Sequence, residues 1–255
     1  MKILVLPDIQ AKPGVDFTYL SNIGKYICEK RPDVVVCIGD LADMPSLSSY
    51  DVGKRNFEGR RYTKDVEAAI AAQTALFAPL GALNEQQRRN GKKIYTPRTI
   101  MTTGNHEARI SRAVNEDAKL EGLISLDDLK YKQYFDEVYD FLDVVVVEGV
   151  AFSHYFVTGT AGRPASTASA QLNKKHMSCI AGHQQGLQIA TAHRADGQRL
   201  TSVIAGSCYE HDEDYMGAQG NKHWRGFLVL HDVNDGQFDL MSVSLEYLKK
   251  KYAPV

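Results

Sequence analysis

The sequence has almost no net charge. Its 255 residues include 30 Lys and Arg against 31 Asp and Glu, which gives a formal net charge of −1. Proteins that wrap a long nucleic acid carry a clear basic excess, so the composition argues against that class. It leaves open a local basic groove.

Cysteines and long apolar runs are also scarce. The four cysteines are scattered with no CxxC pair, and buried free thiols suit a reducing compartment. The N-terminal run "MKILVLPDIQ" is too short for a signal peptide and is interrupted by Asp8. No stretch approaches the roughly 20 apolar residues that span a bilayer. We therefore expect a cytoplasmic protein without a membrane partner.

The first 40 residues alternate between apolar strands and a helix. "KILVLPD" and "PDVVVCIGD" are apolar runs that end at an acid, and residues 16–30 between them have helical spacing. Continuous apolar strands joined by a crossover helix are typical of a parallel pair that is buried on both faces.

The rest of the chain predicts one α/β domain. We expect a loop at 41–61, a helix at 65–89 that is interrupted or kinked at Pro79, a strand at "RTIMTTG", a helix after Gly104 and mainly helix at 118–142. From residue 178 onwards strands dominate, with hairpin turns at "ADG" and "NDG". No linker or repeat divides the chain, so the domain covers 1–255, with a helical and loop insertion at about 44–97.

Polar residues directly follow several of the apolar runs. They are Asp8, Asp40, Asn105, His154 and His183. Ligand sites assemble at the carboxyl ends of strands in α/β sheets. Each residue alone is more typical of a turn, a helix cap or a hydrogen-bonded histidine, but their recurrence after successive strands favours a shared site.

The order of these motifs resembles the calcineurin-like metallophosphoesterase superfamily. The family pattern runs D-x-H, GDxxD, GNH[DE], a lone His and GHxH. This sequence has "PDIQ", "GDLAD" (39–43), "GNHE" (104–107), "SHY" (153–155) and "GHQQ" (182–185). The motifs cover about residues 2–210. The run "CYEHDEDYMGAQGNKHWRGF" further resembles phage- and prophage-encoded members, which would act in the host cytoplasm.

The resemblance implies a fold and a metal site. The fold would be a four-layer αββα sandwich of two mixed β-sheets flanked by helices. Asp40 would bridge two divalent ions; Asn105, His154 and His183 would complete one half of the site. Asp8 and residues 10 and 185 would complete the other half.

The family has histidines at those last two positions, where this chain has Gln10 and Gln185. Both replacements fall on one ion, and both keep a carbonyl oxygen that can ligate. Oxygen ligands suit Mn²⁺ and Mg²⁺, whereas imidazole suits zinc and iron. We therefore expect two divalent ions, of which one is firmly held and the other is exchangeable. Mn²⁺ is the first expectation, and Mg²⁺, Fe or Zn²⁺ are the alternatives.

Catalytic roles follow from the same resemblance. His106 would protonate the leaving oxygen or stabilise the transition state, and Asp43 would orient its imidazole. A solvent-facing histidine at a helix start is the alternative interpretation of His106.

Substrate contacts are less well defined. The segment "GKRNFEGRRYTK" (53–64) interleaves basic residues with Phe57 and Tyr62, which is typical of a phosphate-binding or single-strand stacking loop. A solvated basic loop fits the same pattern. The candidate substrate-binding residues are Arg60, Arg61, Arg109 and Arg163. For Arg109, a surface salt bridge to Glu116 or Asp117 is the alternative.

One acidic cluster has no counterpart in the family pattern. His211, Asp212, Glu213 and Asp214 are consecutive, and we expect them to form a solvated loop.

Together these features predict a metal-dependent phosphoesterase. Phosphodiesters of nucleotides or nucleic-acid ends are the first expectation, with a phosphomonoesterase or protein phosphatase as alternatives. A non-catalytic scaffold with a degenerate metal site is the competing hypothesis, because Gln10 and Gln185 depart from the family pattern.

Overall fold

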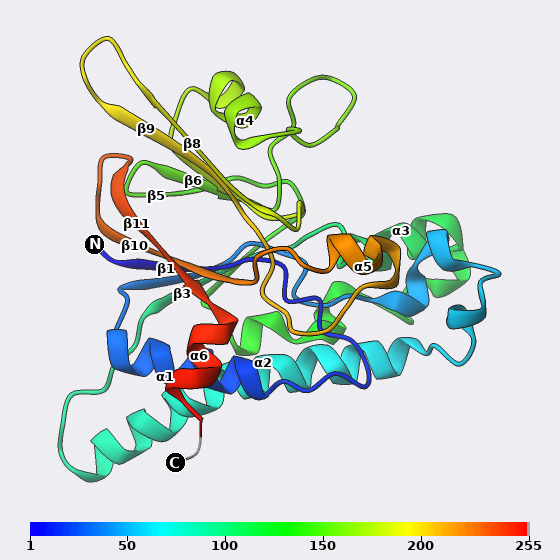
Figure 1. Ribbon diagram of the computed structural model, residues 1–255. Helices are drawn as coiled ribbons and strands as arrows, with labels where there is room; N and C mark the ends of the chain where they lie inside the picture. Colours follow the sequence, from blue (N-terminus) through cyan, green and yellow to red (C-terminus); the bar gives the residue numbers. More distant parts are fainter. Residues whose placement is uncertain (254–255) are drawn as a thin grey trace.

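Two mixed β-sheets pack face to face and carry helices on their outer faces (Figure 1). The computed structural model describes residues 1–253. The arrangement confirms the predicted α/β sandwich with layers in the order αββα. Residues 254–255 of the predicted domain lie outside the described residues.

The first sheet has six strands in the order β11-β10-β1-β2-β3-β4. Strands β1 to β4 run parallel, and β10 and β11 are antiparallel additions. The strands are β1 (Ile3–Leu6), β2 (Val34–Cys37), β3 (Arg98–Thr102), β4 (Glu137–Tyr139), β10 (Gly226–Asn234) and β11 (Gln237–Ser244). The predicted parallel pair at the N-terminus is confirmed as β1 and β2, joined by helix α1 (Thr18–Lys30).

The second sheet has five strands in the order β5-β6-β7-β9-β8. Strands β6, β7 and β9 are parallel, whereas β5 and β8 are antiparallel to their neighbours. The strands are β5 (Val145–Val147), β6 (Val150–Ser153), β7 (Cys179–Ala181), β8 (Leu187–His193) and β9 (Arg199–Ala205). The predicted hairpins are confirmed, since "ADG" joins β8 to β9 and "NDG" joins β10 to β11.

Alternate residues of the first sheet point to two different cores. Ile3 and Val5 of β1 pack between the sheets against residues such as Phe152 of β6. Leu4 and Leu6 instead face the helix layer. Burial on both faces explains why these strands read as continuous apolar runs.

The helices cover the outer faces and one end of the sandwich. In Figure 1, α1, α2 (Tyr62–Arg89) and α6 (Leu245–Lys251) lie along the first sheet, and α4 (Ala168–Lys175) lies over the second. Helix α3 (Ala108–Glu116) and the short α5 (Gly217–Gly220) lie at the end of the molecule where β1, β2 and β3 finish.

Helix α2 is long and apolar enough to cross a membrane by length and composition, although the sequence led us to expect no such segment. Alanine accounts for much of its apolar character. Ala69, Ala72 and Leu76 are buried in the same core cluster as α1, and buried Gln73 donates to the Leu129 carbonyl at 2.9 Å. We therefore assign α2 to the helix layer of a non-membrane domain.

The prediction of mainly helix at 118–142 is wrong. This segment forms short 3₁₀ turns at Ala118–Leu120, Leu126–Leu129 and Tyr131–Gln133, followed by strand β4. Gly122 and Lys130 have left-handed backbone, with φ of 74° and 58°. Such residues end a right-handed helix, so the segment 118–142 cannot be one continuous helix.

Two predicted helix boundaries also differ. Helix α2 begins at Tyr62 and continues through Pro79 to Arg89 as one element, so the predicted interruption does not occur. Helix α3 begins only at Ala108, because the preceding residues form a turn in which the backbone N–H of His106 donates to Asp40 Oδ1 at 2.9 Å.

The close contact between α1 and α2 yields a stability prediction. A Cβ added at Gly24 would lie 2.2 Å from the Leu76 carbonyl oxygen and 2.9 Å from Pro79 Cγ. Overpacking of this kind costs about 1–3 kcal/mol, so Gly24→Ala should lower the free energy of unfolding by that amount in urea titrations. Gly81→Ala is the matched control, because Gly81 has open space around it and alanine in a helix should add up to about 1 kcal/mol. Equal stability of the two variants would contradict the predicted close packing.

Candidate active site

The predicted site residues lie in loops at the ends of five strands. Asp8 follows β1, Asp40 follows β2 and Asn105 follows β3, and these strands are parallel neighbours. His154 follows β6 and His183 follows β7 in the facing sheet. Because the strands of each set end at the same edge, the sandwich brings both rows of side chains together.

The backbone around the site is tightly packed and locally strained. Gln10, Asp40 and His183 have positive φ values of 46°, 50° and 65°, a conformation that costs a non-glycine residue about 1–2 kcal/mol. A Cβ at Gly104 would lie 2.1 Å from Asp40 Oδ1. One at Gly182 would lie 2.4 Å from Asp8 Oδ1. Glycine therefore lets the carboxylates contact the neighbouring loops.

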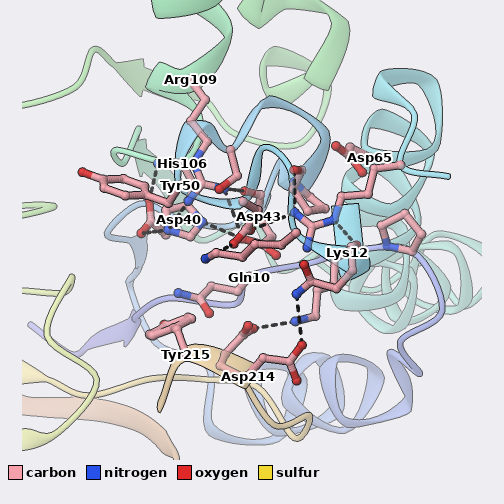
Figure 2. Close-up of a pocket in the computed structure, with 18 of the residues that line it drawn as sticks. Gln10, Lys12, Asp40, Asp43, Tyr50, Asp65, His106, Arg109, Asp214 and Tyr215 are labelled. Carbon is pink, nitrogen blue, oxygen red and sulfur yellow. Dashed lines mark hydrogen bonds and ion pairs between the residues drawn. The ribbon is translucent and has the colours of Figure 1, made fainter. Parts of the chain in front are cut away.

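A cavity of about 1090 Å³ opens over these loops (Figure 2). Its floor includes Gln10, Asp40, Asn105, His183 and Gln185. One wall comes from the segment 45–65, and the opposite wall from residues 212–215. The loop predicted at 41–61 therefore lies beside the site as a series of 3₁₀ turns, Pro45–Leu47, Ser49–Asp51 and Arg55–Phe57.

Three predicted ligands form a cluster that can hold a metal ion. Ligand atoms of Asp40, His154 and His183 lie within 4.8 Å of one another. The amide oxygen of Asn105 lies 2.8 Å from both His154 Nε2 and His183 Nδ1. His154 Nδ1 lies 2.9 Å from the Ile38 carbonyl, a contact in which Nδ1–H donates and Nε2 faces the cluster, as in metal-binding histidines.

The charges in the cluster attract a cation. Burial favours the neutral imidazole of His154, but the carboxylates of Asp40 and Asp8 outweigh this and raise its pKa to about 9. Burial also raises the pKa of Asp8 to about 6. For His183, burial and the neighbouring His154 lower the pKa to about 4, so its imidazole is neutral and available as a ligand at pH 7.

The second half of the predicted site contains Asp8, Gln10 and Gln185. Gln185 Nε2 donates to Asp8 Oδ2 at 3.0 Å. The Oε1 atoms of Gln10 and Gln185 are buried and accept no hydrogen bond from any described residue. A buried acceptor without a partner costs about 1–3 kcal/mol, and a divalent cation between these oxygens and Asp8 would remove that penalty. The donor set therefore fits an oxygen-ligated ion.

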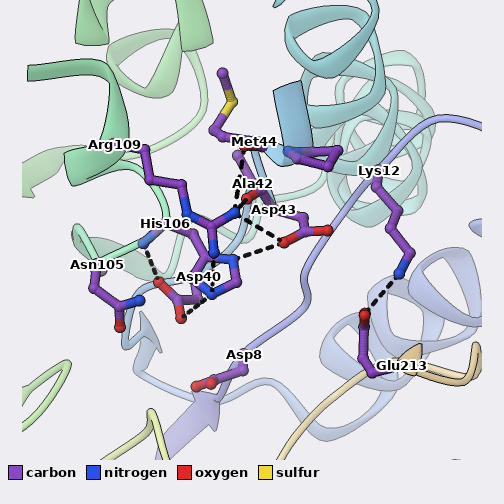
Figure 3. A network of polar contacts seen from close by, with 12 residues as sticks. Asp8, Lys12, Asp40, Ala42, Asp43, Met44, Asn105, His106, Arg109 and Glu213 are labelled. Atoms are coloured by element: carbon purple, nitrogen blue, oxygen red, sulfur yellow. Dashed lines mark hydrogen bonds and ion pairs between the residues drawn. The ribbon is translucent and has the colours of Figure 1, made fainter. Parts of the chain in front are cut away.

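His106 and Asp43 form the predicted pair beside the cluster (Figure 3). His106 Nδ1 lies 2.7 Å from Asp43 Oδ1, and its Nε2 lies 3.7 Å from Asp40 Oδ2. Burial lowers the pKa of His106, but the carboxylates of Asp40 and Asp43 outweigh it and raise the pKa above its usual value. Asp43 accepts from Nδ1–H, and Nε2 accepts from Arg109 Nη2 at 3.1 Å while it is unprotonated. The raised pKa lets Nε2 take up a proton when Arg109 turns away from it.

The candidate arginines fall into two groups. Arg60, Arg61 and Arg109 line the cavity. Arg109 Nη2 lies 3.1 Å from His106 Nε2, and its Nη1 donates to the Asp43 carbonyl at 2.7 Å, which replaces the alternative salt bridge to Glu116 or Asp117. Arg163 is exposed in the loop that precedes α4 and is not among the residues that line the cavity.

The acidic cluster at 211–214 is only partly the solvated loop that we expected, since Asp212 and Asp214 are exposed but Glu213 is not. Glu213 is buried and contacts Lys12 Nζ at 2.7 Å and His211 Nε2 at 2.8 Å. Asp212, Glu213 and Asp214 line the cavity. Lys12 comes from the loop after β1, so an ion pair between distant segments holds this wall in place (Figure 3). Sequence spacing does not reveal such a pair.

Glu107 is a site residue that the sequence reasoning missed. Its side chain is fully buried. Oε2 accepts from the backbone N–H of Asp40 at 3.0 Å and of Gly104 at 2.8 Å. Oε1 accepts from the Ala42 N–H at 2.9 Å and the Tyr131 hydroxyl at 2.8 Å. The only sequence signal was its place next to His106 in "GNHE".

Comparison with known proteins identifies one matching family. The family model for calcineurin-like phosphoesterases matches residues 1–222. No curated protein matches the chain. Similar solved structures include Yfce, a phosphoesterase from E. coli, with 15% identity, a TM-score of 0.40 and coverage of 96% of this chain and 100% of that one.

Two further structures are similar at the same level. The protein TT1561 of Thermus thermophilus has 11% identity and a TM-score of 0.39, and the match covers 96% of this chain and 98% of that one. GAP50, the anchor in the inner membrane complex of Plasmodium, has 12% identity and a TM-score of 0.34, with coverage of 96% and 85%.

The role of Glu107 can be tested by removing its charge. Glu107→Gln replaces one carboxylate oxygen with an NH₂ group, which cannot accept from the two groups that donate to that oxygen. Each buried donor left without an acceptor costs about 1–3 kcal/mol. The free energy of unfolding should fall by at least about 2 kcal/mol, and calorimetric Mn²⁺ binding should weaken because Asp40 loses its support. Glu116→Gln removes the same charge from an exposed position of α3 and should change neither quantity. Unaltered Mn²⁺ affinity in Glu107→Gln would refute the supporting role.

Proposed function

This chain belongs to the calcineurin-like phosphoesterase family, and we propose that it hydrolyses phosphodiesters of nucleotides or nucleic-acid ends. The chain is a metal-dependent phosphoesterase by family. The observation that carries the finer proposal is the shared cavity, in which the proton-holding pair His106–Asp43 lies beside the Asp40, His154 and His183 cluster.

Bound divalent ions would lower the pKa of a water and neutralise charge on the phosphoryl oxygens. Asp40, Asn105, His154 and His183 would hold one ion. Asp8, Gln10 and Gln185, with Asp40 shared, would hold the other.

The remaining chemistry belongs to the side chains. Asp43 accepts from Nδ1 of His106 and so fixes the imidazole with Nε2 towards the cavity. His106 would donate its proton from Nε2 to the leaving oxygen, which an alkoxide such as a ribose oxygen requires. Arg109 Nη2 donates to that nitrogen at 3.1 Å while the imidazole is neutral. Once Nε2 carries its proton, Nη2 would donate to a phosphoryl oxygen instead and orient the ester.

The size of the cavity supports a substrate larger than a phosphate group. Its volume of about 1090 Å³ reaches the upper end of the range for small-molecule pockets. Arg61 lines it and has no ion pair within residues 1–253, so it can contact a second phosphate, whereas the guanidinium of Arg60 is paired with Asp51. The four cysteines are free, which supports a location in the cytoplasm, that of the host if the gene is phage-encoded.

The first test separates metal binding from proton transfer. With Mn²⁺, the wild type should hydrolyse bis-p-nitrophenyl phosphate, and Asp40→Asn should lose both activity and one or both ions. His106→Ala should lower kcat by about 10²- to 10⁴-fold for an ester with an alkoxide leaving group while metal content stays unchanged. Loss of metal in His106→Ala would show that His106 is a metal ligand. A wild type that hydrolyses monoesters but not diesters would show that the substrate is a phosphomonoester.

We further propose Mn²⁺ as the main ion, with Mg²⁺, Fe or Zn²⁺ as alternatives. The half-site with two imidazoles suits most first-row metals, whereas the half-site of Asp8, Gln10 and Gln185 offers only oxygens and suits Mn²⁺ or Mg²⁺. The two ions should therefore differ in affinity.

Dialysis and calorimetry can check this difference. The wild type should retain about one ion per chain after gentle dialysis and should bind the second reversibly. The double variant Gln10→His/Gln185→His should bind a second Zn²⁺ more tightly, because imidazole suits zinc. Gln184→His, which adds a histidine beside the site at a residue that donates to the Ala165 carbonyl, should not. Two equally retained irons or zincs in the wild type would contradict the asymmetry.

A further inference from the structure

Two exposed tyrosines line the cavity on opposite walls. Tyr50 lies in the 3₁₀ turn Ser49–Asp51 and is 81% exposed. Tyr215 lies in the turn Asp214–Met216 and is 68% exposed. Both line the same cavity as Asp40 and His106, and Figure 2 shows Gln10 and Asp40 between them in that view.

The aromatic residues of segment 53–64 are already engaged elsewhere. The guanidinium of Arg60 packs over the Phe57 ring at 5.5 Å. The Tyr62 hydroxyl donates to Asp128 Oδ2 at 2.7 Å. Neither ring is among the residues that line the cavity, so Tyr50 and Tyr215 are the rings that a substrate in the cavity can reach.

Contacts made by neighbouring residues hold the turn that carries Tyr215 in place. The neighbouring Asp214 accepts from Asn56 Nδ2 at 3.2 Å, which joins the two walls. Buried Glu213, paired with Lys12, fixes the start of this turn. The turn that carries the ring is therefore in place before a substrate arrives, which limits the entropy lost on binding.

The two walls differ in charge. The wall that carries Tyr50 has Lys54, Arg60, Arg61 and Lys64 beside Asp51, Glu58 and Asp65. Lys54 and Arg60 pair with Asp51, and Lys64 pairs with Glu67, whereas none of the ion pairs within residues 1–253 involves Arg61. Asp212 and Asp214 lie on the wall that carries Tyr215. A phosphate group would contact Arg61 on the first wall and avoid the acidic wall, and uncharged bases would contact the tyrosine ring on each wall.

From this arrangement we infer that Tyr50 and Tyr215 stack on bases of a single-stranded nucleic acid whose phosphodiester lies at the metal cluster. The inference rests on the proposed function, and it identifies Tyr50 and Tyr215 as the residues that determine substrate specificity. Stacking on an aromatic ring tolerates any base, so the pair selects nucleic acid over other phosphodiesters without reading a sequence.

Two substrates with the same leaving group isolate this contact. Thymidine 5′-(p-nitrophenyl phosphate) and ethyl p-nitrophenyl phosphate both release p-nitrophenolate, but only the first carries a nucleoside. In Tyr50→Ala or Tyr215→Ala, the ratio of kcat/KM for the two should fall by about 5- to 150-fold, which is the range for loss of one stacked base. Tyr50→Phe and Tyr215→Phe keep the ring and should keep the ratio. Tyr247→Ala removes a half-exposed tyrosine from α6 and should also keep it.

Binding provides a second measurement that does not need turnover. A hexathymidylate with phosphorothioate linkages, followed by fluorescence anisotropy with Mn²⁺ present, should bind the alanine variants more weakly than the wild type. Thermal melting of each variant checks that the fold is intact. Tighter binding of a phosphoserine peptide than of the hexathymidylate would overturn the inference.

The outcomes separate the two proposals. If the wild type hydrolyses both diesters and neither alanine variant changes the ratio or the binding, the stacking inference is wrong and the proposed phosphodiesterase stands. If the wild type hydrolyses neither diester, the proposed function fails and the hexathymidylate titration decides the stacking inference by itself.

Discussion

The carboxylate of Glu107 is the contact on which the geometry of the site depends. It accepts from the backbone of Asp40 and Ala42 after β2, from Gly104 after β3 and from the Tyr131 hydroxyl. The loops that carry Asp40 and Asn105 are therefore tied to one buried group. Since strained loop conformations persist only when the surroundings determine them, this contact explains how Asp40 keeps its left-handed backbone, with φ of 50°.

The same loops bury charged side chains, which lowers the stability of the fold. Asp8, Asp40 and His154 are almost completely buried, and buried charges are expensive unless they are paired or bind a metal. Mutual pairing offsets part of this penalty, as the short contact of 3.3 Å between His154 Nε2 and Asp40 Oδ2 indicates. The two unpartnered glutamine oxygens offset none of it. These buried groups therefore lower the stability of the fold, and a bound cation would offset that cost.

The sequence predicted the parts of this protein that depend on local patterns. Apolar runs that end at Asp8, Asp40 and His183 located the strands and their common edge, because periodicity and strand ends are local features. The fold and the family followed from the order of the motifs.

Contacts between distant segments were not predictable in the same way. The region 118–142 was misassigned because left-handed residues such as Lys130 break a pattern that otherwise looks helical. The burial of Glu213 depends on Lys12, 201 residues earlier in the chain. The placement of Tyr50 and Tyr215 on facing walls likewise arises only when the chain has folded.

The hydrogen bond between Gln185 and Asp8 gives the glutamine substitution a consequence beyond metal preference. Both Asp8 oxygens already accept N–H groups, from the His183 backbone and from the Gln185 amide. For Gln185 to ligate an ion at the proposed half-site, its amide would have to turn its oxygen inward and give up this hydrogen bond. Without the ion, the amide nitrogen satisfies the carboxylate, as in this structure. A histidine that coordinates through one ring nitrogen has no equivalent rotation that exchanges a ligand oxygen for a donor. Rotation of one amide would thus be enough to exchange a donor for a ligand at Asp8, with no movement of the loop backbone.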